Sequence, residues 1–149
     1  FAAGVMYDAG TPDDIQRTAK LWNARIACNR GEHSTVLDDL AALVTFGGSA
    51  GAEAQYLLAE HDHNAGAFDA CEEKLFVLIE QFYNQDAWKN KGFLLLVKTY
   101  IGMNDLFQAR ATANSILANV QVAEVQEAVS DLLLEIDALE AATTEPNQE

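Results

Sequence analysis

The chain has 149 residues, with 23 Asp or Glu against 9 Lys or Arg, giving a formal net charge of −14 at pH 7. This length suits one domain with a buried core, and the charge repels phosphate backbones and anionic lipid, so we expect no nucleic-acid binding. No apolar run approaches the roughly 18 residues of a membrane span, so we expect no direct membrane insertion.

Helical signals recur along the chain, and strand signals do not. The two prolines lie near the ends, so nothing in the interior breaks long helices. Ser34, Asp86 and Asp105 are expected to cap helices, Asp105 with Gln108 in a capping box, and Gly48 is expected to help stop one. The expected helices cover about 12–29, 34–46, 50–64, 68–83, 86–102, 105–119 and 121–141, ahead of a polar tail at 143–149.

The turns recur at a nearly constant spacing. Gly31, Gly66 and Asn104 are 35 and 38 residues apart, each between two expected helices. Such a period is typical of a helical solenoid, in which small residues let paired helices approach closely. The residues expected at these close approaches and on the inward faces beyond them are Ala24, Ala59, Val97, Val36, Cys71, Ala109, Leu40, Leu43, Leu75, Leu78, Ala113 and Ile116.

The final expected helix carries an apolar stripe with helical spacing. Its acidic residues lie largely off this stripe, so we expect one face to pack on the preceding helices. The stripe consists of Val125, Val129, Leu132, Leu133, Ile136 and Leu139.

These residues resemble the tetratricopeptide repeat (TPR) pattern over about residues 17–119. One copy comprises Leu58, Ala59, Gly66, Phe68, Cys71, Leu75 and Leu78; a second comprises Leu96, Val97, Tyr100, Asn104, Leu106, Ala109 and Ile116; a weaker first copy comprises Ala24, Gly31, Val36, Leu40 and Leu43. The resemblance implies an all-α, right-handed TPR-like helical solenoid in a single domain at 1–142. It would have about three helix hairpins, at 17–49, 52–85 and 90–120, and a C-terminal capping helix at 121–141.

The chain also departs from the repeat pattern at several places. Asp62 stands where an aromatic residue is usual, Asn104 replaces a turn glycine, and no proline closes a repeat. An insertion of about four residues around Asn84 to Trp88 lengthens the second interval. We expect Trp22 and Trp88 to be structural, with Trp88 in this linker joining two repeats; an exposed Trp88 would instead mark a contact site.

The stretch 52–119 is also similar to the TPR segments of bacterial cell-envelope proteins. This likeness implies a periplasmic or cell-envelope-associated protein, and a cytoplasmic location is the alternative. TPR proteins generally bind an extended peptide or a partner helix on the concave face made by the first helices of their hairpins. On this register the partner-binding residues are Arg25, Tyr56, Glu60, His63, Lys91, Leu94 and Lys98.

The expected function is therefore a non-catalytic protein–protein interaction scaffold that binds a peptide or partner segment. Tyr56 beside Lys91 and Lys98 would suit an acidic or amphipathic segment; alternatively, Tyr56 packs between repeats and the lysines are solvated. The alternative function is a structural or assembly segment of a longer TPR array, which self-associates or stacks on upstream repeats. The Lys/Asn clamp with which some TPR domains hold a carboxyl terminus is not reproduced.

Chemistry-bearing motifs are sparse. His61 and His63 are two residues apart on an expected helix and point in nearly opposite directions, so we expect no metal site and no cofactor. No phosphate loop or nucleophile elbow occurs, so we expect no catalytic residues and no enzyme activity. The spacing of Cys28 and Cys71 fits no metal-knuckle motif. We interpret both as small buried hydrophobic residues in preference to a disulfide.

Overall fold

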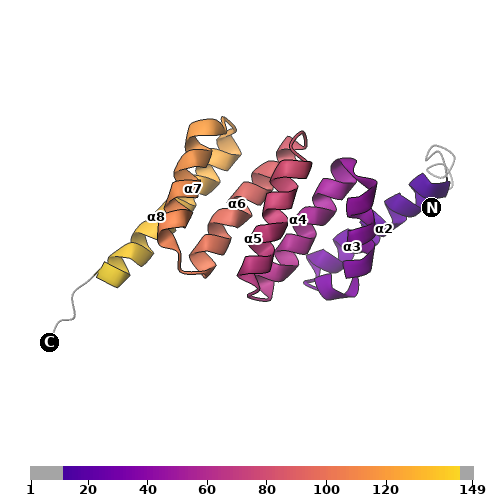
Figure 1. The fold of residues 1–149 in the computed structure, drawn as a ribbon, viewed down its shortest axis with the longest axis horizontal. Helices are drawn as coiled ribbons and strands as arrows, with labels where there is room; N and C mark the ends of the chain where they lie inside the picture. Colours follow the sequence, from indigo (N-terminus) through magenta and orange to yellow (C-terminus); the bar gives the residue numbers. More distant parts are fainter. Residues whose placement is uncertain (1–11, 145–149) are drawn as a thin grey trace.

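The computed structural model describes residues 12–144, and this part of the chain is all-helical (Figure 1). The all-α prediction is therefore confirmed for these residues. None of their helices combines the length and apolarity needed to cross a bilayer. The elements are α2 (Pro12–Asn29), the short 3-10 turn η1 (His33–Thr35), α3 (Leu37–Phe46), α4 (Gly48–Asn64), α5 (Phe68–Gln81), α6 (Asp86–Gly102), α7 (Leu106–Asn119) and α8 (Ala123–Thr144).

The helices follow one another in a row, with α2 and α8 at opposite ends (Figure 1). Each helix packs against the next one in the sequence, and α4 also contacts α2 and α6, while α6 also contacts α8. The helices α3, α5 and α7 have at most slight contacts with one another. We call the surface formed by α2, α4, α6 and α8 the even-helix face, and the opposite surface, formed by α3, α5 and α7, the odd-helix face.

The same turn closes three of the helices. Gly31, Gly66 and Asn104 follow α2, α4 and α6 with φ of 75°, 76° and 58°, in the left-handed region that glycine and asparagine tolerate best. In each case the turn residue donates its amide to the carbonyl three residues back, and the next residue donates to the carbonyl five back, which is a Schellman motif. The second bonds are Glu32 to Ala27 at 2.8 Å, Ala67 to Asp62 at 2.8 Å, and Asp105 to Tyr100 at 2.9 Å.

The unequal spacing of these turns arises between α5 and α6. Gly47 alone connects α3 to α4, whereas residues 82–85 connect α5 to α6. The extra residues thus lie in this connection, slightly before the predicted insertion. Trp88 lies inside α6 and not in the linker, because α6 already begins at Asp86.

The residues expected at close helix contacts are buried, as predicted. Each of them is at most 9% exposed, and most are fully buried. On α8 the predicted stripe is buried at Val125, Val129, Leu132 and Ile136, but Leu139 is 37% exposed because it lies near the end of the helix.

The core consists of two hydrophobic clusters joined through α4. Ala54 and Leu57 of α4 belong to the cluster shared with α2 and α3, while Ala52 and Ala59 of the same helix belong to the cluster that extends through α5, α6, α7 and α8. Tyr56 contacts both clusters. Since α4 is enclosed on almost every side, it is the helix through which the two ends of the row are coupled.

Several predicted helix boundaries are wrong. Ser34 lies in η1, and α3 begins after Val36 with no side-chain cap; Asp86 is the first residue of α6, whose preceding residue also provides no side-chain cap. Gly48 begins α4 instead of ending α3, because the single residue Gly47 completes the reversal. Asp105 does cap α7, accepting from the Gln108 amide at 3.1 Å.

The predicted chain ends are described only in part. The helix α8 continues to Thr144, beyond the predicted end of the capping helix at about residue 141. Residues 145–149 of that tail, and residues 1–11 of the predicted domain, lie outside the described residues.

A substitution at Gly92 can test how closely α6 approaches α5. A Cβ atom there would lie 2.7 Å from Cδ2 of the fully buried Leu78. We expect Gly92→Ala to lower the free energy of unfolding by about 1–2 kcal/mol in urea denaturation, because the overpacking cost exceeds the usual gain of alanine in a helix. Ser130→Ala, on the exposed side of α8, is the control and should be neutral or slightly stabilising; an equally neutral Gly92→Ala would contradict the close packing.

Candidate partner-binding site

The even-helix face brings together most of the residues predicted to bind a partner. Tyr56, Glu60 and His63 lie on α4, and Lys91, Leu94 and Lys98 lie on the neighbouring helix α6, while Arg25 lies on α2 at the end of the row. Their environments separate them into residues tied within the chain and residues left open to solvent.

Arg25 belongs to the first group. Its Nε and Nη2 each donate to Glu53 at 2.7 Å, in a bidentate pair that joins α2 to α4. The hydrogen bonds that Arg25 donates to Glu53 raise the pKa of Arg25 further, and Glu53 itself is only 6% exposed. Since a buried carboxylate needs this partner, Arg25 holds α2 and α4 together.

Glu60 is also paired within the chain. Its Oε1 lies 2.7 Å from Nε2 of His33, which η1 carries and which is buried against the even-helix face. The His33 ring lies 6.3 Å from that of His61, centroid to centroid. The pair fastens the turn after α2 onto α4, a role that the sequence did not indicate for His33.

His63, near the end of α4, contacts residues of α5 and α6. Its Nδ1 is 3.2 Å from Oγ1 of the buried Thr99, whose hydroxyl donates to the Leu95 carbonyl, and its ring meets Phe68 edge-on at 5.4 Å. Burial first, and then the positive charge of Lys98, lower the pKa of His63, so the imidazole is neutral at pH 7. His63 therefore presents a neutral, partly buried edge to the even-helix face.

Tyr56 forms one end of an aromatic and cationic stack. Its ring lies 5.8 Å from the ring of Trp88 on α6, centroid to centroid. Nζ of Lys91, which is also on α6, lies 4.7 Å from the centroid of the same Trp88 ring. Burial raises the pKa of Tyr56 to about 12, so its hydroxyl stays protonated. Tyr56 thus packs between hairpins, and the stack fixes the direction in which Lys91 leaves the surface.

Lys91 and Lys98 are set apart because neither has a carboxylate partner among residues 12–144. Six of the nine basic residues, all of which fall within the described residues, form ion pairs there: Arg17, Lys20, Arg25, Lys74, Lys89 and Arg110. The other three are Arg30, Lys91 and Lys98. Both lysines are exposed on α6, two turns apart and with the half-buried Leu94 between them.

A shallow hollow of about 380 Å³ adjoins this stripe of α6. Lys91 and Leu94 form one side, and Val122, Glu124 and Val125 at the start of α8 form the other. The hollow gives an apolar side chain a place to pack beside a cation. The sequence did not indicate this contribution from α8, because it depends on how the last helix folds back on α6.

A larger hollow, of about 520 Å³, lies on the opposite side of the row. Phe76, Phe93, Ile116 and Val120 supply most of its apolar lining, from α5, α6, α7 and the connection to α8. No charged side chain lines it, so it lacks the features that would orient a charged ligand.

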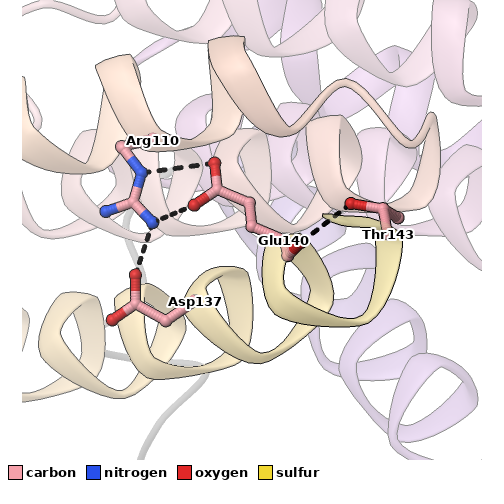
Figure 2. Close-up of polar contacts among 4 residues, drawn as sticks. All are labelled: Arg110, Asp137, Glu140 and Thr143. Atoms are coloured by element: carbon pink, nitrogen blue, oxygen red, sulfur yellow. Dashed lines mark hydrogen bonds and ion pairs between the residues drawn. The ribbon is translucent and has the colours of Figure 1, made fainter. Parts of the chain in front are cut away.

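Arg110 fastens the last helix to the row. Figure 2 shows its guanidinium reaching from α7 to the carboxylates of Asp137 and Glu140 on α8. Thr143 in turn donates its hydroxyl to the Glu140 carbonyl at 2.9 Å. The carboxylates of Asp137 and Glu140 raise the pKa of the Arg110 guanidinium, which is already cationic. These contacts hold the C-terminal part of α8, beyond its buried stripe, against α7.

The described residues contain no group of three or more His, Cys, Asp or Glu side chains placed to hold a metal ion. Cys28 and Cys71 are buried free thiols, which confirms that they are small buried side chains and not a disulfide. Burial raises the pKa of Cys28 to about 11 and raises that of Cys71, so both stay protonated.

Comparisons with protein-family models, curated proteins and solved structures found no match to this chain.

The Arg25–Glu53 pair gives a first test of the site. We expect Arg25→Ala to lower the free energy of unfolding by about 1–2 kcal/mol, since it leaves a buried carboxylate unpaired at a partly solvated edge. Adding Glu53→Gln should recover part of this loss, because it removes the buried charge. Urea denaturation of both single variants and the double variant measures the coupling; strictly additive effects would contradict a structural pair.

The environment of His63 gives a second test. Since its folded-state pKa is lowered, its contribution to stability is complete above about pH 6.5, the ordinary pKa of histidine, and is lost as the pH falls below it. An NMR titration of the imidazole should show a pKa below 6.5 that rises in Lys98→Met. Lys89→Met, on the same helix but paired with Asp86, is the control; an unchanged His63 pKa in both variants would show that Lys98 does not act on it.

Proposed function

We propose that this protein is a non-catalytic interaction scaffold whose even-helix face binds an acidic segment of a partner protein along α6. The observation that carries the proposal is the pair of exposed cations, Lys91 and Lys98, on either side of Leu94. In a chain of net charge −14, six of the nine Lys and Arg side chains pair with carboxylates within the part that the structure describes, whereas these two, like Arg30, form no ion pair there. A ligand that supplies carboxylates at this spacing gains two charge-assisted contacts.

The spacing limits the shape of the ligand. Seven residues of α-helix separate the two lysines by about 10 Å along α6. Carboxylates three residues apart in a polyproline II segment, which has three residues per turn and rises about 3.1 Å per residue, or seven apart in a helix, lie on one side at about the same separation. An apolar side chain between them would meet Leu94 and the hollow beside Val122 and Val125.

Long-range repulsion does not prevent this binding at physiological ionic strength. Charges further away than about 8 Å are largely screened, so the contacts of the α6 stripe dominate over the distant acidic surface. The same acidic surface repels an acidic segment elsewhere on the molecule. This repulsion favours a single position of the segment along α6.

We also propose that the row is a TPR-like solenoid with the even-helix face on its concave side. The identical turns at intervals of 35 and 38 residues support this, as does the closer contact among α2, α4, α6 and α8 than among α3, α5 and α7. A scaffold of this kind presents a continuous surface to an elongated partner.

A second candidate function is assembly through the outermost helix. Trp22 was expected to be structural, yet it is 56% exposed, and Ile26 on the same side of α2 is 47% exposed. Side chains of this size on the end of a helical row favour contact with another protein surface.

Selection from a displayed library of random peptides tests the first proposal. We expect the protein to enrich peptides in which Asp or Glu flank an apolar residue, and a selected peptide to lose at least about tenfold in affinity, or 1.4 kcal/mol, for Lys91→Glu/Lys98→Glu. Lys20→Glu/Lys89→Glu changes the net charge equally and should leave the affinity within about twofold. Failure to enrich acidic peptides, or equal losses in both double variants, would refute it.

A further inference from the structure

The outward side of α5 repeats the side-chain pattern of α6 with the opposite charge. Its exposed residues Glu73, Phe76 and Glu80 follow one another at intervals of three and four residues, as do the two lysines of α6 and the leucine between them. Neither glutamate forms an ion pair within residues 12–144. The odd-helix face therefore carries an acidic, apolar, acidic segment of helix, which is the kind of ligand proposed for the α6 stripe (Lys91, Leu94 and Lys98).

The two patterns come into register when the helices run antiparallel. In each helix, the two charged residues are nearly two turns apart, so they point within about 20° of each other and lie about 10 Å apart along the axis. The apolar residue between them is displaced about 50° to one side, and the displacement has the same hand in both helices. Two facing helices bring such displaced residues to the same side only when they are antiparallel. The facing pairs are then Lys91 with Glu80, Lys98 with Glu73, and Leu94 with Phe76.

Parallel packing fits less well. It would place the two apolar side chains on opposite sides of the contact, and it would align the two helix dipoles unfavourably. Charge, shape and dipole thus favour the same orientation.

The neighbouring helices are compatible with this arrangement. Phe76 lies on the side of α5 that lines a hollow with α7, and Leu94 lies on the side of α6 that lines a hollow with the start of α8. Setting Phe76 beside Leu94 therefore lays α7 of one copy over α8 of the other and places the Phe76 ring next to the hollow of about 380 Å³. Since α7 contains no Asp or Glu, it brings no like charge to the acidic α8.

We infer that copies of this chain associate head to tail, with α5 of one copy bound antiparallel on the α6 stripe of the next. The inference rests on the proposed function, because it names a second copy of the chain as a source of the acidic segment. The two surfaces lie on opposite faces of the row, so the contact is heterologous and each copy can bind two neighbours. The contact is small and its charges are exposed, so we expect a dissociation constant on the order of 100 µM that rises with salt.

Sedimentation velocity of the full chain over a concentration series tests the association. We expect the weight-average sedimentation coefficient to keep rising with concentration, and the dissociation constant to rise at least about tenfold in both Lys91→Gln/Lys98→Gln and Glu73→Gln/Glu80→Gln. The control Asp13→Asn/Glu127→Gln also removes two exposed acidic charges, but at the ends of the row, and should associate as the wild type does. A wild-type chain that is monomeric at about 500 µM, or a control as weak as the α5 variant, would overturn the inference.

Mixing the two variants tests the head-to-tail pairing itself. The α6 variant keeps an intact α5, and the α5 variant keeps an intact α6 stripe. An equimolar mixture should therefore form a 1:1 complex with about the wild-type affinity and no larger species, because each partner has lost one of its two surfaces. Circular dichroism of each variant checks that the helices remain folded. A mixture that associates no more than either variant alone would overturn the pairing.

Peptide binding distinguishes this inference from the proposal on which it rests. A selected acidic peptide is titrated into Glu73→Gln/Glu80→Gln, which keeps the α6 stripe, and into wild-type assemblies, which it should dissociate because it competes with α5. Peptide binding without self-association of the wild type would reject only the head-to-tail contact. Loss of both would reject the α6 proposal as well.

Discussion

The structure depends on close contact between helices at positions occupied by small side chains. Ala24, Ala59 and Val97 are fully buried on successive even helices, and Gly92 of α6 leaves no room for a Cβ atom against Leu78. Close approach lets each even helix contact both its hairpin partner and the next even helix. The even helices consequently form one continuous surface, and the residues along α4 and α6 can act together.

Polar contacts complete this surface and determine which of its charges remain available. Arg25 with Glu53, His33 with Glu60, and Lys74 with Asp62 each bind a neighbouring element to α4. These pairs stabilise the row. The exposed cations of α6 remain, and the Trp88 ring beneath Lys91 orients one of them. The same Arg25–Glu53 pair positions Trp22 at the end of the row, so one contact serves both the α4 junction and the α2 surface.

Much of the helical framework could be predicted from the sequence, because it depends on local signals. The turn residues Gly31, Gly66 and Asn104 share one conformation, and the small and apolar positions around them are buried as expected. Helix starts were less predictable, since Ser34 and Asp86 are common capping residues that here do not cap. The pairing of Arg25 with Glu53 and of Glu60 with His33, and the exposure of Trp22, depend on which helices become neighbours. Spacing along one helix does not contain that information.

We propose that acidic segments bind along α6 on the even-helix face. Chemical-shift mapping of backbone and side-chain signals, with a peptide that carries two acidic residues at the spacing of Lys91 and Lys98 and an apolar residue between them, tests this proposal most directly. We expect shifts concentrated at Lys91, Leu94 and Lys98 and at the neighbouring start of α8. Shifts concentrated instead around Phe76 and Ile116, in the hollow on the odd-helix face, would contradict it.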